Sequence, residues 1–296
     1  MESQLSAHAT STATHDPYLD LLKKSLTAAV YPESSWQIVT GARTGKSTIG
    51  SRVRQWILNR LRKRGLLLVR WKPFEIASRN RGEDWPCFGY SMVGLARMDN
   101  IQMCVETVLR EGVPGDLIET GVWRGGSTIL MKAILSLHAI ADRTVWVADS
   151  FAGLPPPTND IDREQASYDL AGLSYLAVSQ QEVSENFARF GLLDDRVRFL
   201  KGWFSDTLPT APIETLSVLR LDGDMYESTM DALKPLYPKV SVGGFVIVDD
   251  YNSWPGCKRA IDEYRETHRI TDPLVSIDGH AVWWRVTRPL PTAGGI

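Results

Sequence analysis

The stretch DLIETGVWRGGST, residues 116–128, opens with a short apolar run and then turns on three glycines. It is the first of five such runs, which are separated by helical segments: Leu117–Ile118, Val145–Ala148, Val197–Leu200, Val218–Leu221 and Phe245–Val248. Short buried strands that alternate with helices are typical of a parallel sheet covered by helices on both faces. The sequence therefore predicts a doubly wound α/β fold.

The residues that follow the first two runs indicate a nucleoside site, because ligands of such sheets bind beyond the carboxyl ends of the strands. Gly121 and Gly125–Gly126 permit a tight turn, but Trp123 occupies the second glycine of the dinucleotide fingerprint and disfavours a pyrophosphate. Asp149 ends the second run, where an acid accepts hydrogen bonds from a ribose diol. These features favour a cofactor such as S-adenosylmethionine.

The third run leads into LKGWFSDTLP, residues 200–209. Trp203 and Phe204 are placed to flank a base, and Asp206 to accept a hydrogen bond from an exocyclic amine. The alternative, that both aromatic rings pack under the edge of the sheet, is equally compatible with the sequence.

Four acids follow the fourth and fifth runs, in VLRLDGDMYES (218–228) and GGFVIVDDYNS (243–253). Asp222 and Asp224 end one strand, and Asp249 and Asp250 end a strand expected to be its neighbour. Four carboxylates this close repel one another unless a counter-charge is present, and a hard divalent cation with oxygen ligands supplies one. The sequence predicts a divalent metal site here.

The N-terminal third contains two expected helices and a misleading motif. Asp16 and Pro17 are suited to begin a helix in DPYLDLLKKSLTAAVY, and residues 47–64 form a basic amphipathic pattern with Ile49, Val53, Trp56, Ile57 and Leu61 on one side. GARTGKSTIG, residues 41–50, has the wrong spacing for a phosphate-binding loop, because Thr40 stands where its first glycine belongs. We expect a flexible connector there.

Composition excludes several classes of protein. The chain has 296 residues, 43% of them hydrophobic, and a net charge of -2, which gives no overall attraction to nucleic acid or anionic membranes. No export signal or membrane span is recognisable, and Cys87, Cys104 and Cys257 lack the spacing of metal ligands. We expect a cytoplasmic protein with reduced thiols.

Long blocks of the sequence resemble the macrocin O-methyltransferase family of S-adenosylmethionine- and Mg²⁺-dependent sugar O-methyltransferases. The blocks include GVPGDLIETGVWRGG, RTVWVADSFAGLP, LRLDGDMYESTMDAL and GGFVIVDDY, and the similarity runs from about Glu83 to Arg285. Residues 35–74 and the loop 155–178 depart from the family pattern. The resemblance implies a class I methyltransferase fold, a Rossmann-like sheet of seven strands with the last antiparallel, and an N-terminal helical lid.

The resemblance also implies an organisation and a site. Together with the residue patterns, it divides the chain into a disordered tail (1–16), a helical lid or extension with a basic insertion (17–95) and a methyltransferase domain (96–290). It assigns Asp224 as the general base and three acids as ligands of Mg²⁺, namely Asp222, Asp249 and Asp250. It places S-adenosylmethionine at the turn around Glu119–Ser127 and at Asp149. With the residues of the third run, the candidate cofactor-binding residues are Glu119, Thr120, Gly121, Gly125, Ser127, Asp149, Ser150, Trp203, Phe204 and Asp206.

The expected reaction is methylation of a sugar hydroxyl on a glycosylated natural product, by a homodimer or higher homo-oligomer that binds neither nucleic acid nor membrane. One alternative is methylation of a phenol or catechol, because acids and magnesium serve both reactions. A second alternative is a non-catalytic protein that binds nucleic acid through the basic helix 47–64, although the acid cluster would repel phosphate.

Overall fold

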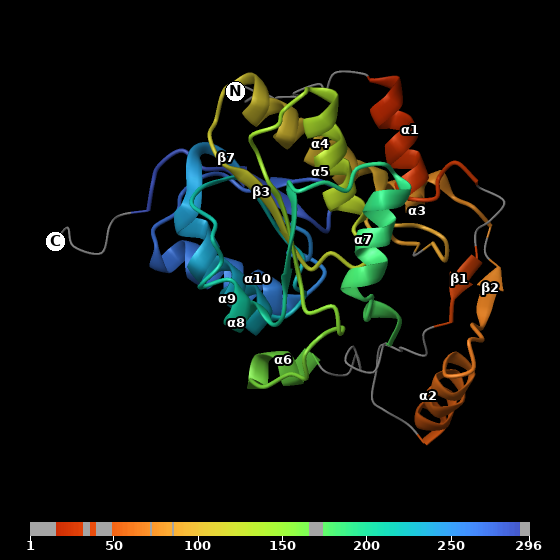
Figure 1. Cartoon of the computed structure of the whole chain (residues 1–296). Coiled ribbons are helices and arrows are strands. Elements are labelled where there is room, and N and C mark those ends of the chain that lie inside the picture. Colours follow the sequence, from red (N-terminus) through yellow and green to blue (C-terminus); the bar gives the residue numbers. More distant parts are fainter. Residues whose placement is uncertain are drawn as a thin grey trace, which may run out of the picture.

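The computed structural model describes residues 16–31, 36–39, 49–71, 73–84, 86–165 and 174–290 (Figure 1). The expected disordered tail lies outside these ranges except for Asp16, and so does most of the connector at 41–50. The middle of the loop 155–178 is also outside them.

A seven-stranded sheet forms the centre of the molecule, in the order β5-β4-β3-β6-β7-β9-β8. Strands β3 to β7 run parallel and contain the five predicted runs, while β9 pairs antiparallel with β7. The predicted fold is therefore confirmed, including the antiparallel strand. The bounds are β3 Asp116–Thr120, β4 Val145–Asp149, β5 Val197–Lys201, β6 Leu216–Leu221, β7 Val240–Val248, β8 Val275–Ser276 and β9 Val282–Arg285.

Helices cover both faces of this sheet, because successive strand residues point into two different cores. Leu117 belongs to a core shared with α1, α4, α5 and α7, whereas its neighbour Ile118 belongs to a core shared with α9 and α10 (Figure 1). The bounds of these helices are α1 Pro17–Leu26, α4 Leu95–Arg110, α5 Gly126–Leu137, α7 Gln180–Arg189, α9 Tyr226–Leu236 and α10 Pro255–Thr267, with the short α8 at Phe204–Thr207.

The strand order reverses between β3 and β6, since the chain passes outward from β3 through β4 to β5 and then returns to form β6 on the other side. Ligands of doubly wound sheets bind beyond the strand ends at such a point. The topology therefore predicts a ligand site at the residues that follow Thr120 and Leu221.

The N-terminal segment begins as predicted. Asp16 caps α1 by accepting hydrogen bonds from the backbone N–H groups of Tyr18 (2.8 Å) and Leu19 (3.2 Å). Further along, β1 (Trp36–Ile38) pairs antiparallel with β2 (Val69–Trp71), and α2 (Ile49–Arg62) lies between them in the chain; α3 spans Ile76–Arg81. The proposed boundary between an extension and a methyltransferase domain stays a prediction.

The basic helix is present as α2, but most of its apolar side is uncovered within the described chain. Trp56 is 61% exposed, Val53 and Ile57 are exposed as well, and Leu58 is buried. Figure 1 shows α2 at a distance from the sheet, which explains why the periodic pattern is not matched by burial. Within the ranges given above, no helix combines the length and apolar character needed to cross a membrane.

The backbone at Gly121, just after β3, packs closely against the backbone of Asp222, just after β6. A Cβ added to Gly121, whose φ is 87°, would lie 1.8 Å from the carbonyl oxygen of Asp222. Gly121→Ala must therefore push β3 away from β6, and we expect it to lower the free energy of unfolding by about 3 kcal/mol or more, measured by urea denaturation.

Gly112→Ala is the matched control, because Gly112 also has a positive φ (66°) and a Cβ there would meet no described atom within 4 Å. It should cost only the backbone strain of about 1 kcal/mol. Equal losses in the two variants would contradict the close packing at Gly121.

Candidate active site

The ends of β6 and β7 bring three predicted acids together. Leu221 and Val248 are paired in the parallel ladder, so the residues that follow them lie side by side. Carboxylate oxygens of Asp222, Asp249 and Asp250 all lie within 4.8 Å of one another. Oxygen ligands at this spacing suit a hard divalent cation.

A buried arginine, which the sequence reasoning missed, supplies part of the counter-charge to these acids. Arg220 is fully buried, and its guanidinium group donates to Glu119, to Asp249 and, at 2.7 Å, to Asp222. The available signal was a charged residue inside the apolar run VLRLD. An isolated charge is costly to bury, so an arginine in a central strand indicates carboxylates nearby.

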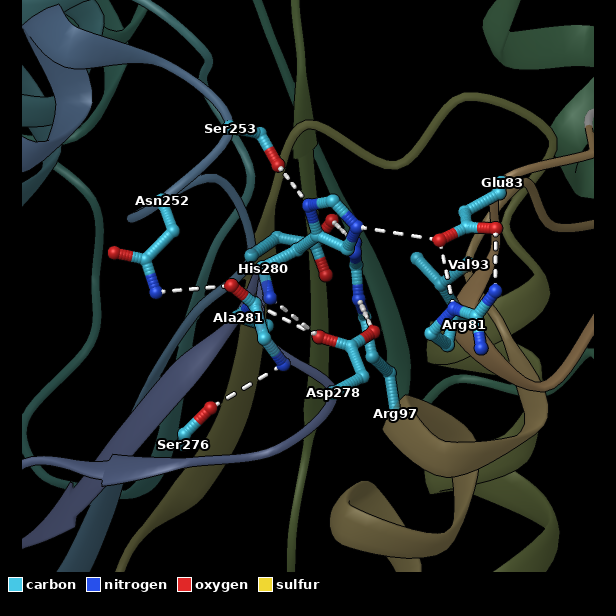
Figure 2. Close-up of polar contacts among 12 residues, drawn as sticks. Arg81, Glu83, Val93, Arg97, Asn252, Ser253, Ser276, Asp278, His280 and Ala281 are labelled. Atoms are coloured by element: carbon cyan, nitrogen blue, oxygen red, sulfur yellow. Dashed lines mark hydrogen bonds and ion pairs between the residues drawn. The ribbon is translucent and has the colours of Figure 1, made fainter. Parts of the chain in front are cut away.

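A second arginine reaches the cluster from α4. Arg97 donates to Asp249. Through Nε it also donates to Asp278, at 2.6 Å, in the turn between β8 and β9 (Figure 2). In the same turn, Nδ1 of His280 lies 3.2 Å from the hydroxyl oxygen of Ser253, and its Nε2 lies 3.9 Å from Glu83 (Figure 2). The turn thus joins α4, the segment after α3 and the loop after Asp250.

The remaining carboxyl groups experience an excess of negative charge. Burial, together with the carboxylates of Asp222 and Asp249, raises the pKa of Asp224 to about 8. Burial and Asp249 raise the pKa of Asp222 to about 6, and burial with the neighbouring acids raises the pKa of Asp250 well above its usual value. Two guanidinium groups therefore do not neutralise the cluster, and a divalent cation fits its charge.

Asp224 occupies an unusual backbone position between the acids and α9. Its φ is 58°, in the left-handed region that non-glycine residues seldom adopt, and its N–H donates to Oδ2 of Asp250 at 3.3 Å. Backbone conformations of this kind persist where the surrounding structure enforces them, and they concentrate at functional sites.

A cavity of about 390 Å³ opens beside this cluster. Among the predicted site residues, seven line it: Gly121, Asp149, Ser150, Trp203, Phe204, Asp222 and Asp224. Glu119, Thr120 and Ser127 are buried and do not line it, and neither do Asp249 and Asp250. Gly125, also outside the lining, turns the backbone with a φ of 86°. Asp206 is exposed and lies outside the lining, so the structure does not place it where it was predicted to bind the nucleobase of the cofactor.

The cofactor side of the cavity is formed by the turns after β3 and β4. Asp149 accepts hydrogen bonds from the N–H groups of Val122 and Phe151, both at 2.8 Å. The hydroxyl of Ser150 also donates to Oδ1 of Asp149, at 3.4 Å. A carboxylate has about four acceptor positions, so these three contacts leave about one position for a ribose hydroxyl. Trp203 is 39% exposed and lines the cavity, whereas Phe204 both lines it and packs against the core beneath. These features fit a nucleoside.

Other lining residues were not among the predicted site residues. They come from the segment after β4, at Gly153–Pro156 and Thr158, and from the start of α9, at Glu227, Ser228 and Asp231. Trp123 also lines the cavity, at the position where the dinucleotide fingerprint would have a glycine, with a φ of 48°.

Comparison with known proteins agrees with this geometry. Demethyldecarbamoylnovobiocin O-methyltransferase of Streptomyces niveus is 58% identical over 213 residues, which cover 71% of this chain and 80% of that protein. A Streptomyces olivaceus relative, 8-demethyl-8-(2,3-dimethoxy-alpha-L-rhamnosyl)-tetracenomycin-C 4'-O-methyltransferase, is 48% identical over 275 residues, covering 92% of this chain and 93% of the relative.

A solved structure of the O-methyltransferase NovP matches with a TM-score of 0.77 and 47% identity, over 92% of this chain and 98% of that one. The family model described as macrocin-O-methyltransferase (TylF) matches residues 15–286, which is most of the sequence. The chain therefore belongs to the macrocin O-methyltransferase family and is an S-adenosylmethionine-dependent O-methyltransferase.

Proposed function

We propose that the enzyme methylates a sugar hydroxyl of a glycosylated natural product, such as a macrolide or a similar secondary metabolite, and that the reaction depends on Mg²⁺. The observation that carries this proposal is the position of Asp224, which lines the same cavity as Asp149 and lies next to the acid cluster. A base and a cofactor site thus face one space. The rhamnosyl group in the name of the Streptomyces olivaceus relative supports a sugar acceptor.

The polar lining near Asp224 supports a sugar over the alternative phenol or catechol. Thr158, Glu227, Ser228 and Asp231 add hydrogen-bonding groups to those of Asp222 and Asp224. Sites for small aromatic molecules are lined mainly by apolar and aromatic side chains. A sugar ring presents several hydroxyl groups, which this part of the cavity is suited to bind.

The mechanism requires a proton acceptor, because a neutral hydroxyl is a poor nucleophile. S-adenosylmethionine supplies a methyl group bonded to a positively charged sulfur. Asp224 takes the hydroxyl proton as the acceptor oxygen bonds to the methyl carbon and the carbon–sulfur bond breaks, with its electron pair remaining on sulfur. Burial and the carboxylates of Asp222 and Asp249 raise the pKa of Asp224 to about 8, so a cation held by those two acids would lower this pKa and favour the ionised form that can accept the proton.

The residues that would hold Mg²⁺ are Asp222, Asp249 and Asp250. When bound, the cation would lower the pKa of the acceptor hydroxyl. Arg220 and Arg97 orient Asp249 by donating to its two carboxylate oxygens, one each. Such outer contacts fix the direction in which a ligand presents its oxygen atoms.

The proposed function is tested directly by incubating the enzyme with rhamnosylated polyketides and, as a competing acceptor, with catechol. We expect mass spectrometry to show the gain of one methyl group on a glycoside in the presence of S-adenosylmethionine and Mg²⁺. Methylation of catechol alone would contradict the proposed acceptor class.

The expected partners are also proposals. Analytical ultracentrifugation tests the homodimer or higher homo-oligomer, and retention on RNA or DNA columns at varied salt tests the nucleic-acid alternative. A cytoplasmic location is supported by the three cysteines, which are all buried and unbridged.

Metal removal should abolish turnover while sparing the affinity for S-adenosylmethionine, because the cluster is placed to serve the acceptor.

Asp250→Asn should weaken Mg²⁺ binding at least about tenfold in calorimetry, since loss of even an outer contact typically costs that much. Asp206→Asn is the control, because Asp206 is exposed and outside the cavity lining. Full activity after exhaustive EDTA treatment would contradict the proposed dependence on Mg²⁺.

Asp224→Asn should lower the rate of methyl transfer about 10²–10⁴-fold, because the amide keeps the shape of the side chain but cannot take a proton. Mg²⁺ and cofactor affinities should hold, and the deficit should shrink as pH rises and hydroxide replaces the missing base. Stopped-flow or quenched single turnovers across pH measure this. Rescue by excess Mg²⁺ without rescue by pH would show that Asp224 is a metal ligand.

A further inference from the structure

Helix α9, which follows Asp224, receives its N-terminal cap from a distant part of the chain. The residue at its own cap position, Met225, provides no side-chain hydrogen bond. Instead, Asp162 accepts hydrogen bonds from the N–H groups of Tyr226 (2.7 Å) and Glu227 (3.1 Å), 64 and 65 residues further on. Asp162 is only 3% exposed, so these hydrogen bonds are shielded from water.

Asp162 is held firmly on its own side of this contact. It lies in α6 (Asp160–Gln165), within the segment that follows β4. Asn159 donates through Nδ2 to Oδ2 of Asp162 at 2.7 Å, and its Oδ1 accepts from the N–H of Asp162 at 2.8 Å. Nearby, the hydroxyl of Thr158 donates to the carboxylate of Glu227. The start of α6 and the start of α9 therefore form one hydrogen-bonded unit.

The turn that carries Asp224 lies between this unit and the sheet. At one end, the N–H of Asp222 donates to the carbonyl oxygen of Thr120 at 2.9 Å. In its middle, the N–H of Met225 donates to the carbonyl oxygen of Gly223 at 2.6 Å. At the other end the chain enters α9, where Asp162 binds. A shift of the first turn of α9 must therefore move Asp224, whose backbone is already in the left-handed region.

The segment that carries Asp162 also covers the cavity. Leu154, Pro155, Pro156 and Thr158 line it, and Leu176 lines it on the far side of the same loop. Next to Leu176, the carbonyl oxygen of Tyr175 accepts a hydrogen bond from the indole of Trp123 at 3.1 Å. The part before residue 166 is thus hydrogen-bonded to α9, and the part after residue 173 to the turn after β3.

We propose that Asp162 is a positioning residue for methyl transfer: by capping α9 it fixes the turn from Asp222 to Met225, so Asp224 reaches its working position only while the 151–165 segment lies against α9. The inference rests on the proposed role of Asp224 as the base. It makes the covering of the cavity and the placement of the base a single structural event.

The chemistry of the cap predicts a graded series of variants. Asp162→Ala removes both acceptors. Asp162→Asn keeps one acceptor oxygen for one of the two N–H groups, and loses the negative charge that favours a helix N-terminus. Asp160→Ala is the matched control, because Asp160 lies on the same short helix with a side chain 91% exposed and pairs only with Arg163 among the described residues.

The first measurement is hydrogen exchange by mass spectrometry on peptides that contain Tyr226 and Glu227, without substrate. Loss of a cap shifts the local equilibrium about 2- to 30-fold, so exchange should accelerate about tenfold in Asp162→Ala, less in Asp162→Asn and not at all in Asp160→Ala. Unchanged exchange in Asp162→Ala would overturn the contact on which the inference depends.

The second measurement is steady-state methylation of a rhamnosylated polyketide. Asp162→Ala should lower kcat about tenfold while the KM for S-adenosylmethionine stays within about twofold, and Asp162→Asn should recover part of the rate. Faster exchange with an unchanged kcat would show that Asp162 only stabilises the helix, and would refute the positioning role. An inactive wild-type enzyme would instead contradict the proposed function, and the positioning role with it.

Discussion

The active site depends on the ion pairs made by the guanidinium group of Arg220. It is fully buried at the end of β6 and binds carboxylates from three neighbouring strands, those of Glu119, Asp222 and Asp249. Removing one partner from a buried ion pair leaves an uncompensated charge and is strongly destabilising. Arg220 therefore holds the ends of β3, β6 and β7 in the arrangement that creates both the acid cluster and the wall of the cavity.

The cluster carries more acid than its arginines balance, and this excess gives it chemical use. Arg97 and Arg220 both donate to Asp249, whereas Asp224 and Asp250 have no ion pair with a basic side chain among the described residues. The unbalanced carboxyls have raised pKa values, and burial is the largest cause. One consequence is attraction for a divalent cation. The other is that a cation balancing Asp222 and Asp249 would favour the ionised form of Asp224, which could then accept a proton.

Local patterns predicted the strands and the acids, while contacts between distant segments escaped them. The runs in β3, β4, β6 and β7 are largely apolar because they are buried on both faces of the sheet, whereas β5, at the edge, is buried only at Val197. Asp222 and Asp249 follow two of the five runs directly. Arg97 is 152 residues from Asp249, and nothing in the helix pattern of α4 marks it as a partner. The same limit applies to Asp162 and Tyr226. Periodicity identified the apolar side of α2, but it carries no information about what covers that side.

The most direct test of a cation site at this edge of the sheet is a crystal structure with S-adenosylhomocysteine and Mn²⁺, which replaces Mg²⁺ and scatters anomalously. We expect an anomalous peak about 2.0–2.3 Å from carboxylate oxygens of Asp222, Asp249 and Asp250, with Arg220 still bound to Glu119. A structure that holds the nucleoside product but shows no peak at these carboxylates would contradict the cation site.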